Sequence, residues 1–273
     1  MHIIEKQLIG KTGNPDQCED FIVITDHFVA IIDGVTGKRK EMEGTGRIAA
    51  QILAKIIQSM DSRISMNDCI ELLTAGIHRY YQEQGMVEIT REDPRNRIAA
   101  SAIIFSRFHR QIWMMGDCQC LVNDQYYQTP TAIDEITSRA RALFNHLELL
   151  SGTTLEELTQ NDPGREFIKP LLQKQSLLQN NPKAGPHAFF IIDGFPVLVS
   201  MVKIVEVPDQ AEIVLASDGY PRLFPTLEQS EAYLQEIIQE DPLQISIHPS
   251  TKGIGLNNIS FDDRAYIRLL TTK

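Results

Sequence analysis

The run from Phe28 to Gly34, with the sequence FVAIIDG, constrains the fold of this 273-residue chain more than any other stretch. Its five leading apolar residues include two β-branched isoleucines, which is typical of a buried strand, and the run is too short for a helix. The strand ends at Asp33, whose carboxylate is followed by a glycine turn. We therefore expect a buried strand that carries an acidic side chain to the edge of a sheet.

A second group of acidic residues stands just upstream of this strand. Glu19 and Asp20 lead into another apolar run, residues 21–25, which a two-residue link joins to Phe28. Such a link is typical of a β-hairpin, and hairpin pairing would place Glu19 and Asp20 at the same end of the sheet as Asp33. Carboxylates gathered there repel one another unless a cation lies between them, and their hard oxygen atoms suit Mg²⁺ or Mn²⁺. The alternative is an acidic turn exposed to solvent.

Composition argues against several classes of protein. With a net charge of −10 and no basic tract, the chain lacks the features of a nucleic-acid-binding protein. No apolar run approaches the ~20 residues that a membrane-spanning helix needs, and Glu5 and Lys6 interrupt the pattern that a signal peptide requires. The four cysteines show neither a disulfide framework nor paired zinc-ligand spacing, so we expect reduced thiols and a cytoplasmic location.

Strand and helix patterns alternate along the chain, which predicts an α+β protein. Residues 131–182 differ because helical caps dominate there, and we interpret them as a helical insertion within a single domain of residues 1–273. Asp193-Gly194 predicts the turn of a hairpin between residues 189–192 and 197–202. The other expected strands are 2–9, 98–106, 111–116, 120–122, 126–127, 212–217 and 265–270, and the expected helices are 45–60, 67–81 and 226–240.

Acidic motifs recur at the ends of these strands, and their order resembles that of the metal-dependent protein phosphatases of the PP2C type (PPM), as in a divergent bacterial-type member. That family has an early Asn-Glu-Asp motif, then Asp-Gly-x-x-Gly, Gly-Asp-Ser-Arg, Ser-Asp-Gly and a final Asp-Asn. The corresponding motifs here are CED at residues 18–20, DGVTG at 33–37, GDCQ at 116–119, SDG at 217–219 and DD at 262–263.

The resemblance implies an α-β-β-α sandwich, in which helices flank two packed antiparallel sheets. It also implies hydrolysis of phosphomonoesters, most often phospho-Ser or phospho-Thr in proteins, by a water molecule that two Mg²⁺ or Mn²⁺ ions activate. The alternatives are a phosphatase for a small phosphorylated metabolite and a catalytically silent binding module on the same fold. Residues 131–182 would either cover the site and set substrate choice or act as inert packing.

The family pattern assigns the metal ligands residue by residue. Asp33 would bridge two ions. The carbonyl of Gly34 and, through water, the carboxylate of Glu19 would complete the shell of one ion, and Asp218 and Asp262 would hold the other. These three aspartates are the residues on which the expected catalysis depends.

Three further acids have supporting roles in the resemblance. Asp20 would orient a coordinated water molecule from behind the ligands, and Asp263 stands nearby where the family has Asn. Asp117 matches an acid that helps to bind a weaker third ion. Because Arg222 stands where the family usually has a second acid after Ser-Asp-Gly, we expect this third site to be impaired or absent.

Substrate recognition departs from the family pattern. The early Arg that grips the substrate phosphate is replaced by Pro15. Arg222 is a candidate for the missing clamp, because a guanidinium can bind phosphate with two parallel hydrogen bonds. A solvent-facing Arg222 is the alternative, and Lys11, Arg39 and Arg264 are the other candidate cations.

Overall fold

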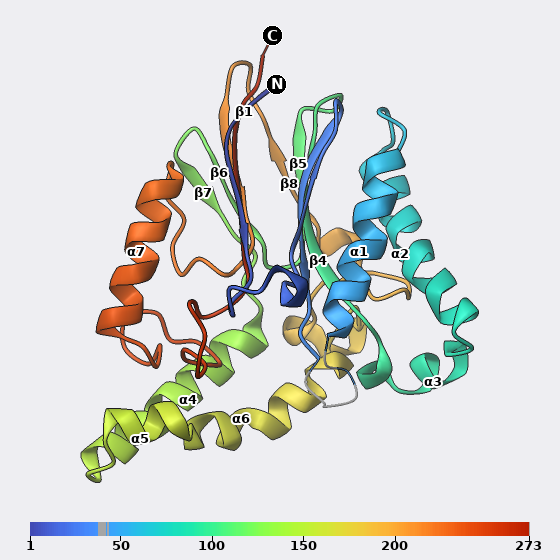
Figure 1. Cartoon of the computed structure of the whole chain (residues 1–273). Coiled ribbons are helices and arrows are strands. Elements are labelled where there is room, and N and C mark those ends of the chain that lie inside the picture. Colours follow the sequence, from blue (N-terminus) through green and yellow to red (C-terminus); the bar gives the residue numbers. More distant parts are fainter. Residues whose placement is uncertain (38–41, 43, 273) are drawn as a thin grey trace.

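The computed structural model describes residues 1–37, 42 and 44–272. Within them, ten strands form two antiparallel five-stranded sheets that pack face to face (Figure 1). The first sheet has the order β1 (His2–Ile9), β10 (Arg264–Leu270), β9 (Glu212–Ala216), β6 (Gln119–Val122) and β7 (Gln125–Tyr127). The second has the order β2 (Phe21–Ile24), β3 (Phe28–Gly34), β4 (Ala100–Ser106), β5 (Gln111–Met115) and β8 (Lys203–Glu206). The predicted α-β-β-α sandwich is confirmed.

Strand β3 shows why an uninterrupted apolar run forms the core of this molecule. Val29 and Ile31 pack in the layer between the two sheets, whereas Ala30 and Ile32 pack in the layer beneath the helices. Successive side chains of a strand point to opposite faces, so a strand buried on both faces needs apolar residues at every position. Each fully buried isoleucine contributes on the order of 1.5–3 kcal/mol to stability. Asp33 is the first charged residue beyond this core.

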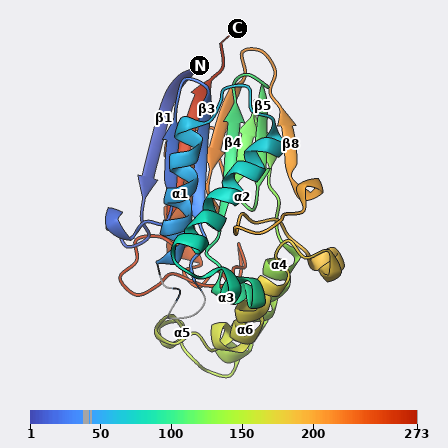
Figure 2. The same cartoon turned by 90° about the vertical axis from the view of Figure 1, so that its right-hand side faces the viewer.

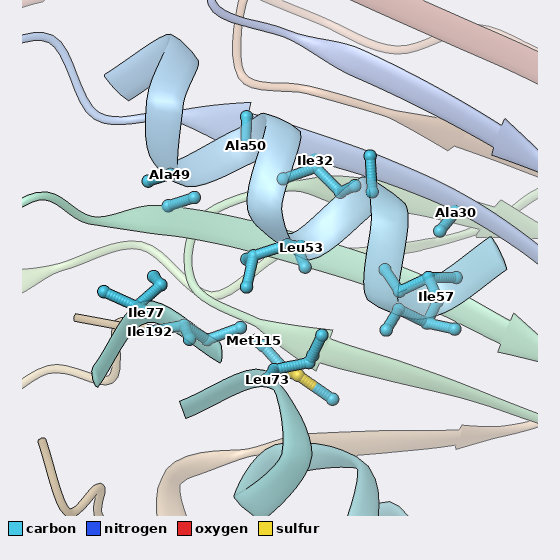
Figure 3. Packing of buried hydrophobic residues seen from close by; sticks show 14 of the residues in the cluster. Ala30, Ile32, Ala49, Ala50, Leu53, Ile57, Leu73, Ile77, Met115 and Ile192 are labelled. Carbon is cyan, nitrogen blue, oxygen red and sulfur yellow. The ribbon is translucent and has the colours of Figure 1, made fainter. Parts of the chain in front are cut away.

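Helices cover the outer faces of both sheets. Helices α1 (Thr45–Ser59) and α2 (Met66–Glu83) lie over the sheet that contains β3, and α3 (Val87–Glu92) follows them (Figures 1 and 2). Figure 3 shows Leu53 of α1 and Leu73 of α2 in one apolar layer with Ile32 and Met115 of the sheet. Helix α7 (Leu227–Glu240) covers the opposite sheet. None of the described helices is both long and apolar enough to cross a membrane.

Three helices lie together beyond one end of the sandwich, namely α4 (Ala132–Leu150), α5 (Leu155–Gln160) and α6 (Pro163–Lys174) (Figure 2). A capping box between Thr154 and Glu157 starts α5. The fully buried Arg141 of α4 pairs with Asp162 at the start of α6 (Nη2 to Oδ2, 2.6 Å), which fixes the two helices together. Short 3-10 helices span Pro15–Gln17, Pro94–Asn96, Gln175–Leu177, Pro182–His187 and Val199–Met201.

The hairpin predicted for residues 189–202 is wrong. Within the described residues this segment makes a single bridge to the sheet, between Ile192 and Ala100, and the regular strand β8 starts only at residue 203. The carboxylate of Asp193 pairs with the guanidinium of Arg97 at 3.1 Å. The stretch is therefore an irregular loop, and the ion pair between Asp193 and Arg97 holds it against the rest of the protein.

Helices α1, α2 and α6 show local features that the sequence patterns did not indicate. The N-cap residue of α1 is Gly44, which has no side chain to cap the helix. The hydroxyl of Thr45, the first helical residue, donates to the Met42 carbonyl. Ser65, which stands before the predicted start, caps α2 by accepting from the amide of residue 68. Pro170 lies inside α6 and does not break it.

Candidate active site

The acidic motifs meet at the end of the sandwich that faces α4 and α6 (Figure 1). Asp33 stands near the end of β3, Asp218 follows β9, Asp262 precedes β10, and Asp117 lies between β5 and β6. Both sheets therefore deliver carboxylates to one place. These residues line a cavity of about 530 Å³, together with Gly34 and Asp263.

None of the described ion pairs involves Asp33 or Asp218, so no described Lys or Arg directly neutralises these two carboxyl groups. Burial and repulsion by neighbouring carboxylates, Asp20 and Asp218 first among them, raise the pKa of Asp33 well above its ordinary value. Desolvation within the cavity, followed by repulsion from Asp117 and Asp262, raises the pKa of Asp218 to about 7. The Asp218 side chain is nevertheless open to the cavity, so water and ions can reach it.

Glu19 lies behind Gly34, and only 6% of its surface is exposed. Its Oε2 accepts a hydrogen bond from the Thr36 hydroxyl at 2.6 Å, whereas its buried Oε1 has no hydrogen-bond partner among the described residues. Tight backbone packing creates this position, because a Cβ on Gly34 would lie 2.4 Å from the carbonyl oxygen of Gly46. The glycine of the Asp-Gly motif is therefore required where β3 approaches the start of α1.

Asp20 and Asp263 join the loops that carry the acids. The Ser217 hydroxyl donates to Asp20 at 2.7 Å and accepts from the amide of residue 265 at 2.9 Å. The carboxylate of Asp263 accepts from the amides of Lys11 (2.7 Å) and Glu19 (3.0 Å). Two strand ends and the segment before β2 are thus held together by hydrogen bonds behind the cavity.

Asp117 is held by the second sheet. The hydroxyl of Ser101 in β4 donates to its Oδ1 at 2.6 Å. Gly116 has a φ of 110°, and a Cβ there would lie 2.3 Å from the same hydroxyl, so the Gly-Asp pair places the carboxylate where only glycine fits. Asp117 therefore lines the cavity with one oxygen already engaged.

Asp262 differs from the other cavity acids because two lysines neutralise it. The Lys11 ammonium lies 3.0 Å from Oδ1, and the Lys252 ammonium contacts Oδ2. Burial acts in the opposite direction, yet these two cations hold the pKa of Asp262 below its ordinary value. Sequence reasoning missed Lys252, because this residue stands in a loop without periodicity between α7 and β10.

The other candidate cations are distributed differently from the sequence expectation. Arg139 of α4 and Arg165 of α6 line the cavity, as does Lys252. Arg222 is exposed and is not part of the cavity lining; its guanidinium lies over the ring of Phe224, 4.9 Å from the centroid. Of the remaining candidates, Arg264 pairs with Glu231 of α7 and Arg39 lies outside the described residues.

The fit of a divalent ion to these residues is uneven. Within the described part of the chain, no three His, Cys, Asp or Glu side chains are arranged so that they could hold a metal ion without adjustment. Asp117 and Asp262 have partners that an ion would have to replace, namely Ser101 and the two lysines. Asp33 and the Oε1 atom of Glu19, by contrast, have no ion-pair partner among the described residues, so hard oxygen donors are available on the side of β3.

The comparisons with known proteins agree with this architecture. No protein-family model and no curated protein matches the chain by sequence. A crystal structure of a bacterial serine phosphatase matches with 15% identity, 99% coverage of both chains and a TM-score of 0.51. A variant of a bacterial serine phosphatase, in which one arginine is replaced by lysine, matches with 15% identity, 99% coverage of both chains and a TM-score of 0.50.

The chain has a PP2C-like fold. The resemblance read from the acidic motifs is thereby confirmed at the level of the fold. The serine/threonine phosphatase PstP/Ppp of Mycobacterium tuberculosis also aligns over 100% of both chains, with 11% identity and a TM-score of 0.49. At 15% identity the two serine phosphatase structures establish the architecture alone.

Proposed function

We propose that the chain is a divalent-metal-dependent phosphatase that hydrolyses phosphomonoesters, with phospho-Ser or phospho-Thr in proteins as its substrate class. The observation that carries the proposal is the convergence of Asp33, Asp117 and Asp218 on a cavity that Arg139 and Arg165 also line. Carboxylates hold divalent ions and guanidinium groups bind phosphate, so both components of a phosphate-hydrolysing site face one space.

The proposed ion is Mg²⁺ or Mn²⁺, because the candidate ligands are all hard oxygen atoms. Asp33 and the Gly34 carbonyl would hold it, Glu19 would complete its shell through water, and Asp218 faces the same space. Two observations support this assignment. The Oε1 atom of Glu19 has no hydrogen-bond partner among the described residues. Burial and repulsion between carboxylates raise the pKa of Asp33 and of Asp218, and a bound cation would relieve that repulsion. When bound, such an ion supplies a water molecule of lowered pKa and neutralises charge on phosphate.

The Cys and Ser side chains of the acidic motifs are poor candidates for a covalent nucleophile. Burial raises the pKa of Cys18 to about 12, and burial with repulsion from Asp33 raises the pKa of Cys118 far above neutrality, so both remain thiols. The Ser217 hydroxyl is engaged with Asp20 and with a backbone amide. The proposed step is direct attack by water on phosphorus, with Arg139 and Arg165 binding the phosphate oxygens and α4 and α6 limiting access of bulk water.

The substrate class is proposed by analogy with the bacterial serine phosphatase that shares the fold. A small phosphorylated metabolite would use the same acids, and would differ only in what α4 and α6 bind beyond the phosphate. The net charge of −10 supports the further proposal that nucleic acid is not a partner. The proposed cytoplasmic location rests on cysteine usage alone.

The proposal is tested by turnover of p-nitrophenyl phosphate with Mn²⁺, with Mg²⁺ and with EDTA, followed by a panel of phosphopeptides, sugar phosphates and nucleotides. We expect hydrolysis that requires the ion and that is fastest on phospho-Ser or phospho-Thr peptides. If the protein prefers a sugar phosphate or a nucleotide, the proposed metal-dependent hydrolysis stands, but the proposed substrate class is wrong. A folded protein that hydrolyses nothing in the panel with either ion would contradict the proposed function and favour a silent binding module.

A further inference from the structure

The carboxylate of Asp262 has both of its oxygens engaged by groups of the chain itself. Its Oδ1 accepts from the Lys11 ammonium at 3.0 Å and from the amide of Asp263 at 3.0 Å. Its Oδ2 accepts from the Lys252 ammonium. A carboxylate offers about four acceptor positions, so these three donors leave little room for a further ligand.

The two lysines reach Asp262 from segments far apart in the sequence, and Lys11 is fixed there. Lys11 follows β1, its backbone amide donates to Asp263 at 2.7 Å, and its ammonium lies 3.6 Å from the same carboxylate. Lys252 lies in the loop before β10 and lines the cavity. Their side chains are only 22% and 32% exposed, so both cations are partly withdrawn from water.

Charge is therefore divided across the cavity. On the side of β10, two ammonium groups balance the two carboxylates of Asp262 and Asp263. On the side of β3, none of the described ion pairs involves Asp33 or Asp218. A divalent ion is attracted to the second side, and at Asp262 it would have to displace two cations and then lie beside them.

We propose that Lys11 and Lys252 take the place of a second divalent ion, so that the chain binds one ion, on the side of Asp33, and Asp262 is not a metal ligand. Lys252, which faces the cavity, then serves as the fixed cation that contacts substrate phosphate beside the single ion. This role for Lys252 rests on the proposed phosphatase function, whereas the count of bound ions does not.

The test is the number of Mn²⁺ ions bound per folded chain, measured by equilibrium dialysis with elemental analysis and by electron paramagnetic resonance. We expect one ion and the six-line spectrum of isolated Mn²⁺ for the unaltered chain. The double variant Lys11→Met and Lys252→Met, which keeps the approximate length of both side chains, should bind two ions and give an exchange-coupled spectrum. Lys55→Met with Lys183→Met, two exposed lysines outside the cavity, is the matched control and should stay at one.

The outcomes separate this inference from the proposed function. Two ions in the unaltered chain, or one ion in a folded Lys11→Met/Lys252→Met variant, would overturn the inference and leave a metal-dependent phosphatase intact. No bound ion at up to millimolar Mn²⁺ would contradict both. If the double variant does not fold, Asp262→Asn replaces it: retention of one ion supports the inference, and loss of the ion overturns it.

Discussion

At the scale of single residues, Asp33 is the position on which the proposed chemistry depends most. It is the carboxylate that a buried strand delivers into the cavity, and Asp218 faces it from the other sheet. We expect Asp33→Asn and Asp218→Asn each to lower Mn²⁺-dependent turnover of p-nitrophenyl phosphate by at least about a hundredfold, because an amide is a poor ligand for a divalent ion. Steady-state kinetics at saturating Mn²⁺ provide the measurement.

A matched control for these variants is Asp26→Asn, an exposed aspartate between β2 and β3, at the other end of the same strands. It removes one negative charge without touching the cavity, so its turnover should stay within about twofold of the unaltered chain. If Asp33→Asn keeps full activity at saturating Mn²⁺, Asp33 is not a ligand and the proposed site is wrong.

At the scale of elements, the helices α4 and α6 bring the arginines that the strands do not supply. Arg165→Ala should lower kcat/KM by about tenfold, because a charge-assisted bond to phosphate contributes roughly 1.5–3 kcal/mol. Arg165→Lys should recover only part of the loss, since an ammonium cannot reproduce a bidentate contact. Arg222→Ala, by contrast, should remain within about twofold, because its guanidinium lies over Phe224 outside the cavity lining.

Kinetics of these three variants on one phosphopeptide decide between the two arginines. A large loss in Arg222→Ala, with Arg165→Ala unaffected, would restore Arg222 as the phosphate clamp expected from the sequence. Equal losses on phosphopeptides and on p-nitrophenyl phosphate would mean that α6 contributes to phosphate binding and not to substrate choice.

The loop that replaces the expected hairpin depends on the buried ion pair between Asp193 and Arg97. Asp193 has no exposed surface, and the Arg97 guanidinium also lies over the ring of Phe195. Asp193→Ala should lower the free energy of unfolding by about 3 kcal/mol, because it leaves a largely buried guanidinium without its partner. The double variant Asp193→Ala/Arg97→Met should recover part of the lost free energy of unfolding, as measured by denaturant unfolding. No change in Asp193→Ala would show that the pair does not hold this loop.

These elements also explain what could be predicted from sequence. Strands such as β3 and β9 were predicted because burial on both faces demands an unbroken apolar run, and acids at their ends stand out against it. The hairpin prediction for residues 189–202 was wrong, because the Asp-Gly turn signal is local. The partner that holds Asp193, Arg97, is 96 residues away in the sequence. Lys252 and Arg165 were missed for the same reason: a single cation on a loop or helix has no pattern until the fold brings it to the cavity.

At the scale of the whole molecule, the packing of two sheets gathers carboxylates that repel one another. Folding therefore raises the pKa of Asp218 from about 3.9 in an unfolded chain to about 7. Between these values the folded chain binds more protons than the unfolded chain, so this group's contribution to stability is greatest below about pH 4. That contribution falls as pH rises and is fully lost above about pH 7.

We therefore expect Asp218→Asn to be more stable than the unaltered chain in EDTA at about pH 8, by about 1–2 kcal/mol after allowance for screening on the open side of the cavity. The difference should shrink as pH falls and nearly vanish only at about pH 4 and below, where Asp218 is protonated in both the folded and the unfolded chain. Denaturant unfolding of both proteins across this range measures the difference. Saturating Mn²⁺ should reverse the order at the higher pH, since only the unaltered chain retains the carboxylate that faces the ion. A constant difference between the two proteins across the whole range would refute the raised pKa.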